Sequence, residues 1–168
     1  MGPKISKLEF APTDNQTDKA IHHILYEFNM LLFSYLSLNK YPKKQDEFDQ
    51  NQFNCLLECF LVHFRAIYYF FFIPRFKDDV VVADFKIKKY DNVISDECTQ
   101  QINKNLAHLT YSRLEKPNWN YRTMTKEITP FILNFLEKIE SKTGIDPEDI
   151  MTIRTQKKIC KTVIASRV

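Results

Sequence analysis

The residues best suited to chemistry lie in one polar stretch, QINKNLAHLTYSR, at positions 101–113. His108 has a side chain that exchanges a proton near neutral pH, and Arg113 has one that holds a phosphate through two parallel hydrogen bonds. Lys104 and Asn105 precede them on the same predicted helix and are candidate phosphate contacts. These groups predict metal-independent RNA cleavage, with His108 moving a proton at the 2′-hydroxyl and Arg113 stabilising the charged phosphorane. The alternative is a histidine at the edge of the core that binds a backbone carbonyl.

A second group of ionisable residues lies inside an apolar run, CLLECFLVHFRAIYYFFFI, at positions 55–73. The run is long enough to cross a membrane, yet it contains Glu58, His63 and Arg65. An acid or an arginine at the centre of a bilayer costs roughly 2.5–3.5 kcal/mol each. We therefore expect the run to be the central helix of a soluble bundle, with no membrane partner.

Arg65 needs a partner in such a bundle. Glu58 lies seven residues away on the same helix face, two turns distant, which is too far for an easy ion pair. Asp78, Asp79 and Asp84 follow in an acidic segment that could fold back along the helix. The sequence thus predicts a structural ion pair between Arg65 and Asp78 or Asp79. The alternative is that Arg65 binds a ligand phosphate.

The histidines suggest a third kind of site. His22 or His23, together with His63 and His108, could converge inside a helical bundle, and His23 and Glu27 are four residues apart on one helix face. No paired metal-binding motif accompanies them. We therefore predict no metal and no cofactor.

Regular spacing of apolar residues predicts the elements that position these side chains. Repeats at three and four residues predict helices at about 18–40, 50–73, 95–114 and 126–142. The last of these starts so that Pro130 falls in its first turn, where proline is tolerated. The sequence Asp146-Pro147 then marks the start of a basic final helix.

The predicted fold is all-α, a single-domain bundle of four to five mostly antiparallel helices with the helix at about 50–73 in its centre. Residues 1–17 form an irregular lead-in, residues 18–150 the bundle, and residues 151–168 a basic C-terminal helix or tail. That basic segment is a candidate contact for nucleic-acid phosphates, although a solvated helix face is the commoner meaning of such a run.

Composition narrows the class of protein. Two glycines are too few for Rossmann folds, β-sandwiches or phosphate-cradling loops, whereas 14 Phe and 8 Tyr indicate an aromatic core. A net charge of +3 does not by itself predict nucleic-acid binding. No signal peptide opens the chain and the cysteines show no C-x-x-C spacing, so we expect a cytoplasmic protein.

The stretch INKNLAHLTYSR, preceded by a helix that carries LVHFRAIYYFFF, resembles the HEPN superfamily over about residues 50–114. The resemblance implies a small helical bundle, often dimeric, from a toxin–antitoxin or antiviral system, and in catalytic members a metal-independent ribonuclease. In that family an arginine precedes the histidine. Here Asn103 and Lys104 stand before His108, and Arg113 follows it.

The implied partners are RNA and either a second copy of the chain or a cognate antitoxin. Two other classes of function stay open. One is a non-catalytic helical module whose aromatic surface binds a partner or forms a dimer. The other is a metal-binding bundle similar to the DinB-like proteins.

Overall fold

The computed structural model describes residues 10–40, 47–88, 90, 96–106, 119–142 and 144–166. These residues form five α-helices and one short 3-10 helix: α1 (Asp14–Lys40), α2 (Glu47–Phe72), η1 (Val82–Phe85), α3 (Asp96–Leu106), α4 (Tyr121–Glu140) and α5 (Pro147–Ala165). The described part of the chain contains no β-strand. The predicted all-α bundle is therefore confirmed.

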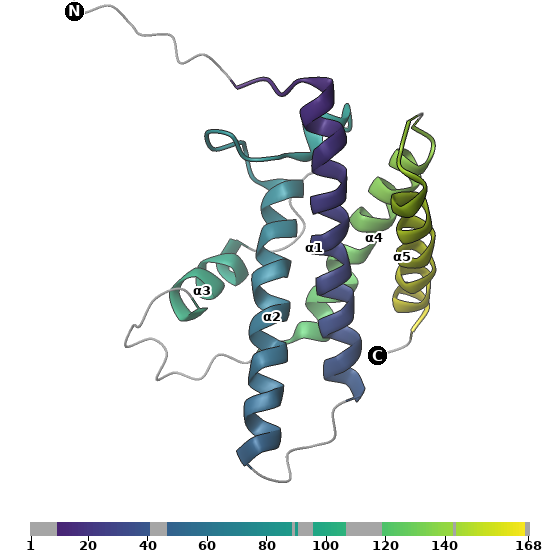
Figure 1. Ribbon diagram of the computed structural model, residues 1–168. Helices are drawn as coiled ribbons and strands as arrows, with labels where there is room; N and C mark the ends of the chain where they lie inside the picture. Colours follow the sequence, from purple (N-terminus) through teal and green to yellow (C-terminus); the bar gives the residue numbers. More distant parts are fainter. Residues whose placement is uncertain are drawn as a thin grey trace, which may run out of the picture.

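Two antiparallel helix pairs make up most of the bundle. Helices α1 and α2 lie side by side in opposite directions, and α4 and α5 form a second antiparallel pair that packs against α1 (Figure 1). Helix α3 lies on the other side of α2 (Figure 1). The short helix η1 follows the C-terminal end of α2 and packs near the start of α1.

Stacked and edge-to-face aromatic rings fill the centre where α1, α2 and α4 meet. The rings of Phe28 and Phe71 stack with centroids 6.0 Å apart and an interplanar angle of 10°. Phe135 from α4 meets Phe70 edge-on at 5.2 Å. All but Phe70 of these rings are 0% exposed, and Phe70 is 7% exposed. Such contacts add to the free energy gained from apolar burial.

Helix α2, predicted to lie in the centre of the bundle, is central along its C-terminal half only. Its buried residues begin at Phe60, and the first half contains none. Phe48 is 67% exposed and Cys55 is exposed. By length and composition α2 passes the test for a membrane span, but half of its most apolar window is buried inside the bundle. The core helix of a soluble protein has the same length and composition, so these features are only weak evidence for a membrane span.

The two C-terminal helices begin at polar caps. The side chain of Asn120 accepts a hydrogen bond from the amide of Thr123, so α4 begins at Tyr121 rather than at the predicted 126. Pro130 consequently lies inside α4 and not in its first turn, and that prediction was wrong. The cap predicted at Asp146 is present, with Pro147 as the first residue of α5.

Helix α5 packs as part of the bundle. The side-chain amide of Gln156 donates to the Leu25 carbonyl of α1 at 2.8 Å. On the α4 side, Glu140 accepts from Lys157 at 2.6 Å and from Arg154 at 3.1 Å. These two hydrogen bonds lower the pKa of Glu140. Part of the basic character of α5 is therefore neutralised within the protein.

Candidate functional site

Arg65 lies over the ring of Tyr69, one turn further along α2. The guanidinium carbon is 5.4 Å from the ring centroid, within the range of a cation–π contact. The Tyr69 hydroxyl accepts a hydrogen bond from the side-chain amide of Asn103 on α3 at 3.4 Å. Arg65 is exposed, and Tyr69 is half-buried. The pair thus presents a cation beside the contact between α2 and α3.

Two more cations lie over aromatic rings just beyond the end of α2. The ammonium nitrogen of Lys77 is 5.2 Å from the Phe76 ring centroid, and Phe76 is 67% exposed. The guanidinium of Arg75 is 5.3 Å from the ring of Phe10, which is 41% exposed. We call these three pairs, Arg65–Tyr69, Lys77–Phe76 and Arg75–Phe10, the cation–aromatic surface.

The acidic segment after α2 is held by Arg75 instead of Arg65. Arg75 forms an ion pair with Asp84 and donates to the Asp79 carbonyl at 2.6 Å. The Asp79 carboxylate accepts from the Phe76 amide at 3.2 Å.

The predicted ion pair of Arg65 with Asp78 or Asp79 is therefore wrong. Arg65 and Asp79 line the same cavity of about 360 Å³, but no ion pair joins Arg65 to an acid among the described residues. Arg75 is nearer to these acids along the chain, so its contacts close a much shorter loop. Arg65 is left exposed on its tyrosine.

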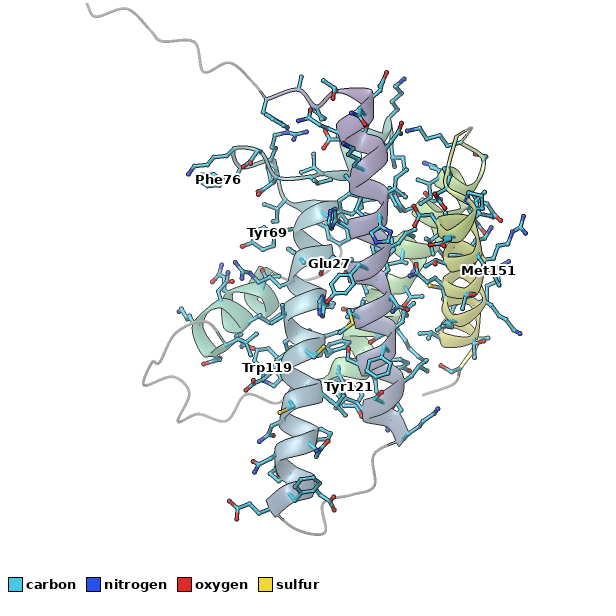
Figure 2. All side chains as sticks on the ribbon, in the orientation of Figure 1. Glu27, Tyr69, Phe76, Trp119, Tyr121 and Met151 are labelled. Atoms are coloured by element: carbon cyan, nitrogen blue, oxygen red, sulfur yellow. The ribbon has the colours of Figure 1, made fainter. Side chains whose placement is uncertain are left out.

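Helix α3 carries Lys104 and Asn105, and it packs on the side of α2 where Tyr69 lies. Ile102 is 1% exposed and anchors α3 in the core, while Lys104 is exposed. Asn105 lines a second cavity, of about 160 Å³, together with Glu58 of α2 and Trp119. In Figure 2, Tyr69 and Trp119 lie along the side of α2 that carries α3, and Phe76 lies beyond its end on that side.

The two predicted catalytic residues, His108 and Arg113, lie outside the described residues. Helix α3 ends at Leu106, which lines the same cavity as Trp119.

His63 lies on a different face, at the contact between α1 and α2. Its Nδ1 is 2.7 Å from the carboxylate of Glu27, and Tyr26 meets its ring edge-on at 5.8 Å. Figure 2 labels Glu27, which lies at this contact between α1 and α2. Burial, together with the charge of Glu27, raises the pKa of the nearby Cys59 thiol. His63 therefore does not join Arg65 and Lys104 in one site.

The histidines do not form a metal site within the described residues. The Nδ1 of His22 is 3.2 Å from Asp149 on α5, while His63 binds Glu27. No group of three or more histidine, cysteine or acidic side chains among the described residues is arranged to hold a metal ion. The structure gives the DinB-like alternative no supporting contact there.

No family model matches this chain, and neither the curated proteins nor the solved structures contain a match to it. The resemblance to the HEPN superfamily stays a prediction.

The sequence reasoning missed the exposed aromatic rings of the cation–aromatic surface. The phenylalanines were assigned to the core, but Phe10, Phe33, Phe48 and Phe76 are exposed, and Phe10 and Phe76 belong to this surface. A local signal was present, because Arg65 and Tyr69 are four residues apart on a helix and Phe76 lies between two basic residues.

Proposed function

We propose that this protein binds single-stranded RNA along the side of α2 that carries α3 and the cation–aromatic surface. Proteins that bind single strands combine cations, which contact phosphates, with exposed aromatic rings, on which bases stack. The observation that carries the proposal is the set of three cations, each placed over an aromatic ring, around the C-terminal end of α2.

The position of α3 extends this surface. Lys104 is exposed on α3, and Trp119 lies beside Asn105 in the adjoining cavity. Trp119 lines the same cavity as Glu58 of α2. Glu58 and Tyr69 are about 16 Å apart along the axis of α2, at a rise of 1.5 Å per residue. Tyr69, Trp119 and Phe76 therefore offer separate stacking positions to an extended strand.

Cleavage is the second part of the proposal and rests on the HEPN resemblance. His108 would transfer the proton from the 2′-hydroxyl, and Arg113 or Lys104 would neutralise the phosphate. Both His108 and Arg113 follow the end of α3 in the chain. A cytoplasmic location and a role in defence or toxin–antitoxin pairing belong to the same proposal.

RNA binding is tested with a fluorescently labelled single strand of about 12 nucleotides, within the usual site size of such proteins. Loss of one stacking ring typically costs about 1–3 kcal/mol, so Phe76→Ala should weaken binding about tenfold. Phe48→Ala, which removes an equally exposed phenylalanine from the opposite end of α2, is the matched control and should have little effect. Equal affinity of Phe76→Ala and wild type would refute the binding surface.

Cleavage is tested separately with the same RNA. His108→Ala should abolish cutting while the circular dichroism spectrum and the RNA affinity stay unchanged. Cutting at the wild-type rate by His108→Ala, or intact RNA after incubation with wild type, would refute catalysis and leave the binding proposal standing.

A non-catalytic interaction module remains a second candidate, favoured by the front face of the α1–α2 pair. Tyr26 and Phe33, two turns apart on α1, are 53% and 56% exposed. Among the described helices, none crosses α1 and α2 on the face shown in Figure 1. An apolar face of this kind is typical of protein contacts.

The two candidates predict different behaviour of Phe33→Lys. If α1 and α2 bind a second copy of the chain, sedimentation should show a dimer for wild type and a monomer for the variant. A wild-type monomer at every concentration would refute self-association through this face.

A further inference from the structure

A cavity of about 450 Å³ lies where the first turns of α1, helix η1 and the C-terminal end of α4 come together. Its size is within the range of sites for small organic ligands. Lysines reach it from two elements, Lys86 directly after η1, and Lys138 and Lys142 at the end of α4. This cavity is separate from the cation–aromatic surface, whose residues do not line it.

Two of these lysines, Lys86 and Lys138, have no acidic partner among the described residues. The acids that line the cavity are Asp14, Asp18 and Asp84. Lys142 forms an ion pair with Asp18, and Arg75 forms one with Asp84. Among the described residues, no ion pair or side-chain hydrogen bond involves the ammonium group of Lys86 or Lys138. Asp14, in the first turn of α1, is stabilised by the partial positive charge of that helix end.

The backbone at Lys86 is in an unusual conformation. Its φ of 58° and ψ of 27° lie in the left-handed region, which favours glycine or asparagine. A lysine there carries a conformational cost, and such residues often belong to functional sites. This observation is separate from the cavity itself, and it concerns Lys86, one of the two lysines for which the described residues supply no acidic partner.

The floor of the cavity is apolar. Ile87 and Ile139 are 4% and 3% exposed, and the half-buried ring of Phe85 packs edge-on against Phe135 at 5.2 Å. A ligand that fits both the lysines and the apolar floor has an anionic group and a flat or apolar body. A phosphate monoester carries a charge between −1.5 and −2 near neutral pH, which two lysines would match.

We propose that this cavity binds a small organic phosphate of about the size of a nucleoside monophosphate. Its phosphate lies between Lys86 and Lys138, and its organic part rests on Phe85, Ile87 and Ile139. Lys142 stays paired with Asp18 and shapes the rim.

The test is titration calorimetry of the full chain with adenosine monophosphate as the probe, and with inorganic phosphate and adenosine for comparison. We expect the nucleotide to bind more tightly than inorganic phosphate, and adenosine not to bind. No heat with the nucleotide, or equal binding of adenosine, would overturn the proposal. So would displacement of the nucleotide by the single-stranded RNA, because the site would then belong to the RNA surface.

Lys86→Gly is the sharpest variant. Glycine adopts a positive φ without strain, so the variant should fold at least as stably as wild type while it binds the nucleotide at least tenfold more weakly. Lys138→Ala should also weaken binding, and Lys158→Ala on α5 is the control for loss of one exposed charge. Equal weakening by Lys158→Ala would show diffuse attraction and overturn the site.

Discussion

Both halves of α2 carry apolar residues at helical spacing, but the halves have different surroundings in the fold. Residues Glu47–Cys59 contain no buried side chain, whereas Phe60–Phe72 supply every buried residue of the helix. The N-terminal turns extend beyond the ends of α4 and α5 (Figure 1). A helical apolar stripe thus shows that a face can be buried and does not say whether the same chain buries it.

The difference also separates two roles. The C-terminal half is fixed by the aromatic core and holds Arg65 and Tyr69 in place on its outer side. The N-terminal half exposes Phe48 and Cys55 and contains no buried side chain. We therefore assign the Arg65–Tyr69 part of the RNA surface to the half that the core supports, whereas the Trp119 cavity lies against Glu58 at the end of the N-terminal half.

The largest expected effect is on stability, from truncation of one ring in each half. Phe71 is 0% exposed and touches rings from α1 and α4, so Phe71→Ala should cost about 3–5 kcal/mol. Phe53 is only half-buried, so Phe53→Ala should cost about 1 kcal/mol or less. Urea unfolding measures both. Equal losses would show that the two halves are equally buried, as in a complex with a partner.

Amide hydrogen exchange tests the same contrast without a mutation. Peptides from residues 47–59 should exchange faster than those from 60–72, because local opening of the first half exposes little buried apolar surface. Mass spectrometry of both peptides gives the ratio. Equal protection of the two peptides at every protein concentration would contradict the difference between the halves.

The smallest expected effect is on thiol reactivity along α2. Cys55 is exposed, whereas burial and Glu27 raise the pKa of the Cys59 thiol and so lower its reactive thiolate fraction. Cys55 should be alkylated first at pH 8, and Cys59 should approach its rate only as the pH rises. Cys160, whose pKa burial raises to about 12, serves as the protected reference. Peptide mapping that finds Cys59 labelled faster than Cys55 would contradict this order.

Helix positions were largely predictable because they depend on local spacing. The run predicted at about 50–73 is α2, Glu47–Phe72, and the start at Asp146-Pro147 is where α5 begins. Pro130 misled the prediction for α4, because an interior proline is costly in isolation and the packed helix tolerates it. Which half of α2 is buried was not predictable, because it depends on where α4 and α5 pack.

Much less of the candidate site could be predicted. Arg65 is exposed because Arg75 binds the acidic segment in its place. Arg75 contacts Asp79 and Asp84, which lie four and nine residues further along the chain. The exposed ring of Phe76 could not be separated by composition from the many buried phenylalanines. The separation of His63 from α3 follows from its contact with Glu27 on another helix, 36 residues away.

Photo-crosslinking tests the central claim most directly. Single-stranded RNA that contains 4-thiouridine is irradiated with the full-length protein, and the linked peptides are identified by mass spectrometry. The account predicts cross-links at Tyr69, Phe76 and Trp119, with yields that fall in Phe76→Ala. Cross-links confined to α5, or none above a denatured-protein control, would contradict it.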